Sequence, residues 1–274
     1  GPLRRWLAGL EAVQVVVDPE GAWPDPAHVA DLSVAADPAS LLTDLAGRLQ
    51  PAEGPWLGAW RDADTRAAKA VDATLGAALN EPQVSRQLVR HLPDDATVFV
   101  AASMPVRDLE TFGPARDVPL RVLSNRGANG IDGTIATAYG VAAASDGPVV
   151  LLLGDVAFAH DLGSLLTARR IGVPLTIVLI DNAGGGIFDF LPIATQHDVY
   201  EPHVATPTGL DPAAAATLFG LHHLEVTTVP ELRAAVEHGI TSAGTTLVHV
   251  RTDRGENLAL HRAVWDAVGA GLAS

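Results

Sequence analysis

The chain has 274 residues, of which 48% are hydrophobic, and its formal net charge is −14. An acidic surface argues against sequence-independent nucleic-acid binding, which needs clustered cations. The absence of cysteine excludes disulfides, thiolate metal sites and a cysteine nucleophile. No apolar run approaches 18 residues and no signal peptide is visible, so we expect a cytoplasmic protein without membrane insertion.

Residues 1–50 have the alternating strands and helix of an α/β domain, but they make up only the tail of one and not a whole domain. Strands are predicted over 14–18 and 30–36, and a helix over 37–49 with Asp37 as its cap. The chain starts with Gly-Pro-Leu instead of methionine, and an amphipathic pattern follows at once. We therefore expect residues 1–50 to be the end of a middle α/β domain in a longer protein.

A turn-rich and then helical stretch over 51–80 is predicted to connect this tail to a second region, 81–274. There, short apolar strands alternate with helices, which indicates right-handed βαβ units and a parallel sheet. The predicted fold class is therefore a doubly wound α/β domain. Its strands are predicted over 97–103, 119–124, 148–155, 174–181, 221–226 and 246–250, and its helices over 81–92, 131–145, 161–172, 230–241 and 256–270.

Two of these strands are almost wholly apolar, yet each ends abruptly in polar residues. The first ends in Gly154 and Asp155, and the second ends in Asp181 and Asn182. In a parallel sheet the carboxyl ends share one edge, which is where ligands bind. A carboxylate, an amide oxygen and a backbone carbonyl suit Mg²⁺, which takes phosphate oxygens as its remaining ligands.

Three glycines over 184–186 follow the second strand and leave room for a carbonyl to turn inward and for a ligand to approach. The helix expected from residue 161 would direct its free N–H groups toward a phosphate. A lone acid at a strand end is more often a cap, and a lone glycine run is more often a turn. Their pairing at matched strand ends favours a Mg²⁺-diphosphate site.

The spacing of this pair resembles the motif of thiamin-diphosphate-dependent enzymes. In that motif a Gly-Asp pair is followed, after a spacer of similar length, by asparagine. Here Gly154 and Asp155 are followed by Asn182, 27 residues after the acid. The common form has glycine after the pair and two consecutive asparagines, whereas this chain has Val156 and Asp181 at those positions.

These departures match one branch of the family. Four separated segments are similar, in order and spacing, to the MenD family, the 2-succinyl-5-enolpyruvyl-6-hydroxy-3-cyclohexene-1-carboxylate synthases of menaquinone biosynthesis. They are SMPVRDLE (103–110), SNRGANGIDG (124–133), GDVAFAHDL (154–162) and DNAGGGIFDFLP (181–192). The resemblance implies that 81–274 is the diphosphate-binding domain of such an enzyme.

The resemblance also implies roles for individual residues. Asp155, Asn182 and the carbonyl of Gly184 would hold Mg²⁺ or Mn²⁺ on the diphosphate, beside Gly154. Ile131 would support the bent cofactor. Three apolar residues would line the cofactor and substrate cavity: Ile187, Phe188 and Leu191. Without the resemblance, each apolar residue is equally well explained as ordinary core.

The implied substrates are 2-oxoglutarate, which is decarboxylated, and isochorismate, which receives the remaining four-carbon unit. Both carry two carboxylates, so they need fixed arginine forks and hydroxyl donors. The resemblance assigns this role to Ser103, Arg107 and Arg126. Taken alone, each arginine would be a solvated surface residue and Ser103 a helix cap.

Family members use a glutamate from an amino-terminal pyrimidine-binding domain to activate the cofactor, and their active site forms between two subunits. No segment of this chain matches that domain, so we expect it to be absent and find no candidate catalytic residue. We predict that the chain alone is inactive and that the full-length enzyme is a homo-oligomer, a dimer or tetramer.

Two alternatives stay open. One is another thiamin-diphosphate enzyme, such as a relative of acetolactate synthase. The other is a non-catalytic module or one subunit of a split enzyme. A Rossmann nucleotide binder is disfavoured because no G-x-G-x-x-G follows the first strand of either region. The ten histidines show no metal-ligand spacing. His160 is expected to be structural, and Asp132 and Asp161 are expected to cap helices.

Overall fold

The computed structural model describes residues 2–22, 24–51 and 54–273. The chain divides into two compact units, 1–60 and 61–274. The connection expected over 51–80 contains one long helix, α3 (Trp56–Leu75), which belongs mostly to the second unit.

The first unit is small and has no core of its own. It comprises α1 (Pro2–Ala8), the parallel pair β1 (Val15–Val17) and β2 (Leu32–Val34), and α2 (Pro38–Arg48). Asp37 caps α2 as predicted, since its side chain accepts a hydrogen bond from the N–H of Ser40 at 2.8 Å. None of the described residues of this unit is buried, which is typical of a piece too small to enclose apolar side chains.

The second unit is built on a six-stranded sheet in the order β4-β3-β5-β6-β8-β7, in which every pairing is parallel. This arrangement confirms the predicted fold class. The strands are β3 (Thr97–Val100), β4 (Arg121–Leu123), β5 (Val149–Gly154), β6 (Leu175–Asp181), β7 (His222–Val226) and β8 (Thr245–Arg251).

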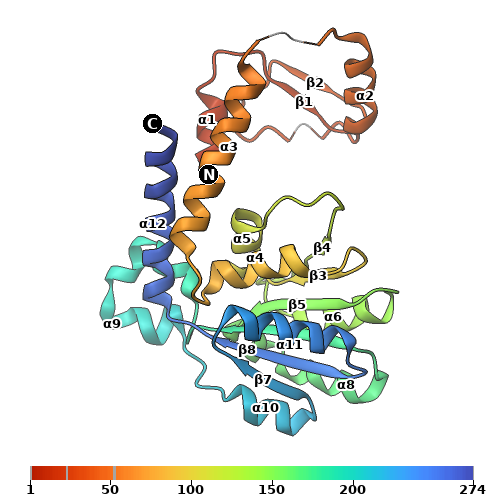
Figure 1. Cartoon of the computed structure of the whole chain (residues 1–274), viewed down its shortest axis with the longest axis vertical. Helices are drawn as coiled ribbons and strands as arrows, with labels where there is room; N and C mark the ends of the chain where they lie inside the picture. Colours follow the sequence, from red (N-terminus) through yellow and green to blue (C-terminus); the bar gives the residue numbers. More distant parts are fainter. Residues whose placement is uncertain (1, 23, 52–53, 274) are drawn as a thin grey trace. The chain divides into compact units, whose positions relative to one another are not determined.

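Helices cover both faces of the sheet (Figure 1). One face carries α4 (Glu81–His91), α5 (Met104–Phe112) and α11 (Val229–Thr241). The other carries α6 (Thr134–Ala143), α7 (Asp155–His160), α8 (Leu166–Ile171) and α10 (Pro212–Phe219). The remaining elements are α9 (His197–Tyr200), α12 (Arg254–Ala273), 3-10 turns over 162–165, 186–190 and 192–195, and a π-helical turn over 201–205.

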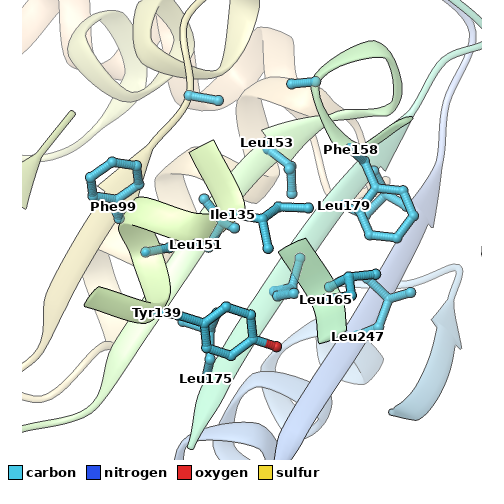
Figure 2. Packing of buried hydrophobic residues seen from close by; sticks show 14 of the residues in the cluster. Phe99, Ile135, Tyr139, Leu151, Leu153, Phe158, Leu165, Leu175, Leu179 and Leu247 are labelled. Carbon is cyan, nitrogen blue, oxygen red and sulfur yellow. The ribbon is translucent and has the colours of Figure 1, made fainter. Parts of the chain in front are cut away.

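The central strands are apolar throughout because alternate residues enter two separate cores. In β5, Leu151 and Leu153 pack on the α6 side, while Val150 and Leu152 pack on the α4 side. Figure 2 shows the first of these cores, where the ring of Tyr139 lies beside Leu175. The Tyr139 hydroxyl is 2.9 Å from the hydroxyl of Thr245, so its polar end is satisfied inside the core.

The helix predicted over 161–172 is present as a 3-10 turn over 162–165 that continues into α8, but it is not the first helix after β5. Instead, α7 begins directly at the end of β5 with Asp155, and a 3-10 turn separates it from α8. Asp161 caps a different element than expected, because its Oδ2 accepts from the N–H groups of Ile135 (2.7 Å) and Ala136 (3.0 Å) in the first turn of α6. The helix that begins at the carboxyl end of β5 is therefore α7, and not the one predicted from residue 161.

None of the described helices combines the length and the apolar character that a membrane crossing needs.

Candidate functional site

A cavity of about 270 Å³ opens at the carboxyl edge of the sheet. Strand order reverses around β3, which has β4 on one side and β5 on the other, and such switch points are where parallel sheets bind ligands. The wall of the cavity comes from the segments that follow β3, β4, β5 and β6. Of the residues predicted for the site, it brings together Ser103, Arg107, Arg126, Ile131, Gly154, Asp155, Asn182, Gly184, Ile187 and Phe188.

Two oxygens in this cavity are buried and lack a hydrogen-bond partner within the described residues: Asp155 Oδ2 and Asn182 Oδ1. The two residues are only 6% and 9% exposed. Leaving such atoms unpaired is costly, so the pair points to a ligand. Both atoms are acceptors at neutral pH, which suits a cation and not an anion.

Gly184, which also lines the cavity, is under a strict steric constraint. Its φ is +136°, and a Cβ there would come within 2.6 Å of the Ala205 carbonyl oxygen, so a side chain cannot be accommodated. The Gly184 carbonyl accepts the N–H of Gly186 at 2.9 Å, which leaves its second lone pair available. Carboxylate, amide and carbonyl oxygens together fit Mg²⁺ or Mn²⁺.

The described residues contain no cluster of three or more histidine, cysteine or acidic side chains that could hold a metal ion by itself. A cation in this cavity would therefore depend on one carboxylate, on neutral ligands and on oxygens of a bound phosphate. This is the usual manner in which Mg²⁺ is held beside phosphates.

The carboxylate of Asp155 is destabilised where it stands, and a cation beside it would relieve this cost. Burial, and then the charge of Asp181, raise the pKa of Asp155 to about 6, although the N–H groups of Val156 and Gly184 oppose the shift. Asp181 itself has a lowered pKa, chiefly because of its hydrogen bond with His249, whose Nε2 lies 3.0 Å from Asp181 Oδ2. Asp181, which stands where the common motif has asparagine, thus has His249 as its partner and does not face the cavity unpaired.

Glu81 is a cavity residue that sequence analysis missed. It lies in the first turn of α4, is 1% exposed and accepts a hydrogen bond from Asn182 Nδ2 at 2.9 Å. Burial raises its pKa to about 7, against the effect of that hydrogen bond. Both protonation forms of a carboxyl group keep an acceptor oxygen available to the amide. The two residues are 101 positions apart, so no local pattern signals the contact.

Ser103 stands at the amino end of α5 but does not cap it, since its side chain makes no capping hydrogen bond. Its backbone has φ 75° and ψ −140°, a combination that is rare outside glycine. Arg107 Nη1 donates to the Ser103 carbonyl at 2.6 Å. Ser103, Arg107 and Arg126 line the same cavity, and both arginines are exposed enough to meet an incoming anion.

The apolar residues of the site divide into two groups. Ile131 packs partly against the core, and Ile187 and Phe188 line the cavity. Leu191 does not contribute to that wall, and its side chain is 49% exposed. Its proposed contact with cofactor or substrate therefore needs a surface that the cavity in this chain does not supply.

The turn that carries Arg126 is held by Asp132, which accepts from the N–H groups of Ala128, Asn129 and Gly130 at 3.0 to 3.3 Å. The prediction that Asp132 caps a helix is therefore wrong, because Gly133 occupies the cap position of α6. His160 Nε2 lies 3.3 Å from the side-chain amide of Asn129. This contact agrees with a structural role for His160.

The loop after Asn182 is fixed from the far side by α12. Arg254 Nη2 donates to both carboxylate oxygens of Glu201 at 2.9 Å, and Arg254 Nη1 lies 3.8 Å from Asp189. The Tyr200 hydroxyl donates to the same Asp189 carboxylate. We call these four residues the loop anchor, since they tie the turn bearing Ile187 and Phe188 to the start of α12.

Comparisons with known proteins agree with this geometry. The family model described as "Thiamine pyrophosphate enzyme, C-terminal TPP binding domain" matches residues 109–250. That span contains Asp155, Asn182 and Gly184. The solved structure of benzoylformate decarboxylase from Polynucleobacter necessarius is similar in fold, with a TM-score of 0.53 and 20% identity over 64% of this chain and 33% of that chain.

Curated relatives named 2-succinyl-5-enolpyruvyl-6-hydroxy-3-cyclohexene-1-carboxylate synthase are more similar in sequence. The one from Rubrobacter xylanophilus is 44% identical over 95% of this chain and 46% of its own length. The one from Myxococcus xanthus is 42% identical over 98% of this chain and 46% of its own length. The chain thus spans about half the length of the curated relatives it matches. It belongs to the thiamine pyrophosphate enzyme family, whose C-terminal TPP binding domain it contains.

Proposed function

We propose that this chain is the diphosphate-binding portion of a 2-succinyl-5-enolpyruvyl-6-hydroxy-3-cyclohexene-1-carboxylate synthase. Such an enzyme decarboxylates 2-oxoglutarate and transfers the remaining four-carbon unit to isochorismate. The names of relatives that are 44% and 42% identical support the proposal. The observation that carries it is one cavity holding two unpartnered buried oxygens, of Asp155 and Asn182, together with two arginines.

In this proposal Asp155, Asn182 and the Gly184 carbonyl hold Mg²⁺ or Mn²⁺ against the diphosphate of the cofactor. When bound, thiamin diphosphate supplies the electron-accepting centre that a 2-oxo acid needs to lose CO₂. The contribution of the chain is to bind and orient. Ile131, Ile187 and Phe188 form apolar walls that exclude water from the reacting end of the cavity.

Arg107 and Arg126 bind substrate carboxylates in this proposal, and Ser103 adds a hydroxyl donor. A guanidinium matches a carboxylate with two parallel hydrogen bonds, which fixes orientation as well as charge. Local arginines are needed because the chain as a whole, with a net charge of −14, repels dianionic substrates.

The acid that activates the cofactor is proposed to come from a pyrimidine-binding domain, in the same polypeptide or in a partner subunit of a homo-oligomer. Glu81 and Asp155 are the acids among the described residues that line the cavity. Both already belong to the proposed metal-binding arrangement, so neither is free to serve the pyrimidine ring.

Calorimetric titration with thiamin diphosphate, with and without Mg²⁺, tests the site directly. We expect binding that requires Mg²⁺ and that weakens about 100-fold in Asp155→Ala, because the variant removes the one charged ligand. Asp146→Ala, which precedes the opposite end of β5, serves as the matched control and should bind normally. Absence of binding by the wild-type chain, or metal-independent binding, would contradict the proposed site.

A further inference from the structure

We infer that Glu81 is a positioning residue, which holds the side-chain amide of Asn182 so that its oxygen, and not its nitrogen, faces the cation position. The inference rests on the proposed metal-diphosphate site and names a residue that builds it. Glu81 acts through Asn182, because the carboxylate itself is already occupied by protein donors.

Glu81 receives three hydrogen bonds from neutral side chains. Its Oε1 accepts from Asn182 Nδ2 and from Thr252 Oγ1, both at 2.9 Å, and its Oε2 accepts from Asn257 Nδ2 at 3.1 Å. Within the described residues it forms no ion pair with a lysine, arginine or histidine. A carboxyl group that is 1% exposed and has no cationic partner is costly, which indicates that its hydrogen bonds serve a purpose beyond stability.

Orientation is the property that such a contact controls. The two ends of an asparagine amide have nearly the same shape, but one donates and the other accepts. If the amide were reversed, its oxygen would face the Glu81 oxygens and its NH₂ group would face the cation. The hydrogen bond to Glu81 selects one orientation, and in that orientation Asn182 Oδ1 is the buried atom without a partner among the described residues.

Gly186 encloses the same amide from another side. A Cβ at this position would lie 3.0 Å from Asn182 Nδ2, tighter than nearly all real contacts. The glycine therefore leaves the space that the amide nitrogen uses to reach Glu81. This second glycine requirement is separate from that of Gly184, which makes room for the backbone of Ala205.

A purely structural role would instead make Glu81 a tie between α4 and α12. Two variants separate these roles. Glu81→Leu removes the acceptors at similar volume, whereas Glu81→Gln keeps an amide oxygen for Asn182. The new Gln NH₂ group also finds a partner, because Asn257 Oδ1 is unpaired and a rotation of that amide presents it. Asn257→Ala is the matched control, since it breaks the tie to α12 but spares the bond to Asn182.

The first measurement is Mn²⁺ affinity in the presence of thiamin diphosphate, read by electron paramagnetic resonance. We expect Glu81→Leu to weaken Mn²⁺ binding by about 10- to 100-fold, the range typical for loss of an outer-shell partner. Gly186→Ala should weaken binding in the same direction without altering Glu81. Glu81→Gln and Asn257→Ala should stay near the wild-type affinity, even where their melting temperatures fall.

Two outcomes of this titration would overturn the inference while leaving the proposed function intact. One is wild-type affinity in Glu81→Leu when Asp155→Ala has lost binding. The other is a loss in Glu81→Gln as large as that in Glu81→Leu, which would mean that charge matters and amide orientation does not. If the wild-type chain binds no Mn²⁺, the proposed metal site fails, and the inference is decided by a metal-free measurement.

That measurement is the side-chain NH₂ resonance of Asn182 in asparagine-selective ¹⁵N-labelled protein, assigned by its disappearance in Asn182→Asp. In the wild type and in Glu81→Gln, we expect one amide proton to be shifted downfield and to exchange slowly with solvent. Both features should be lost in Glu81→Leu. An unchanged Asn182 signal in Glu81→Leu would refute the positioning role without any reference to metal.

Discussion

Ser103 has two properties that rarely occur together in a residue other than glycine: a strained backbone and a place in the cavity wall. Its φ and ψ fall outside the usual regions, and the residue lines the cavity without a capping hydrogen bond to α5. Strain of this kind costs about 1–3 kcal/mol and is concentrated at functional sites. The presence of serine at this position agrees with a requirement for its hydroxyl group.

We therefore predict opposite effects of Ser103→Gly on stability and on function. Glycine relieves the strain and should raise the free energy of unfolding by about 1 kcal/mol, net of its greater freedom in the unfolded chain. It should also weaken substrate binding in the complete enzyme, because the hydroxyl is lost. Ser103→Ala is the control, since it removes the hydroxyl but keeps the strain. Equal stability of the two variants in urea unfolding would contradict this prediction.

Asp108 is a second residue whose environment has a measurable consequence. It is fully buried in α5, and Asp108 Oδ1 lies 3.1 Å from His261 Nε2 in α12. Its other charged neighbours are Arg107 on its own helix and Glu81 on α4. Burial raises the pKa of Asp108 above 3.8, and the close contact with His261 only partly offsets the effect.

A raised pKa means that the folded chain keeps this proton to a higher pH than the unfolded chain does. The associated stability is complete below pH 3.8 and is lost as pH rises through the raised pKa. Relative to Asp108→Asn, the wild type should therefore become progressively less stable as pH increases above about 4. Thermal unfolding of both proteins between about pH 4 and 8 tests this, and parallel curves would show that Asp108 does not titrate differently in the two states.

At the scale of elements, the loop anchor decides whether the cavity keeps its shape. Arg254 is only 16% exposed and contacts two acids, whereas Arg251 makes a single contact to Glu225 with both side chains exposed. Exposed pairs contribute little, often below about 1 kcal/mol, but a partly buried arginine that leaves acids unpaired costs more. These two arginines, three residues apart, form a natural comparison.

We predict that Arg254→Ala lowers the free energy of unfolding by about 2 kcal/mol and increases hydrogen exchange across 184–205. Arg251→Ala should change stability by less than about 0.5 kcal/mol and leave exchange in that segment unaltered. Hydrogen exchange read by mass spectrometry distinguishes the two variants. Equal protection of the loop in both would show that the anchor is dispensable.

The helices and strands differ in how well they could be predicted from the sequence. β5 and β6 were predictable because a short apolar run between turn residues is typical of a strand that is covered on both faces. β4 is reduced to three residues at the edge of the sheet, where its predicted flanks find no partner strand among the described residues. The helix predicted from 161 is present as a 3-10 turn and α8, but α7 was missed because β5 leads straight into it, with no side-chain cap between them.

The site residues also divide into those that a local sequence pattern identifies and those whose role depends on contacts distant in sequence. Asp155 and Asn182 were found because each ends an apolar strand, which is a local signal. Glu81 was not found, because an acid in the first turn of a helix is already accounted for by the helix dipole. Its role depends on partners more than 100 positions away, and no periodicity or motif records such contacts.

For the whole molecule, we predict that the 274-residue chain does not release CO₂ from 2-oxoglutarate when supplied with thiamin diphosphate and Mg²⁺. The reason is that the acids lining its cavity are both engaged near the metal position. Mixing with a pyrimidine-binding domain from one of its relatives should restore turnover that depends on Arg107 and Arg126. A coupled assay for CO₂ decides the point, and turnover by the chain alone would contradict it.

The three hydrogen bonds of Glu81 also bear on the order in which the proposed cofactor site is assembled during synthesis. They join residue 81 to residues 182, 252 and 257, so the carboxyl group gains its first partner once residue 182 is made and the other two only after β8 is complete. Contacts this distant in sequence form late and slowly. A nascent chain can therefore build most of its sheet and orient the amide of Asn182 before the tie from Glu81 to α12 forms.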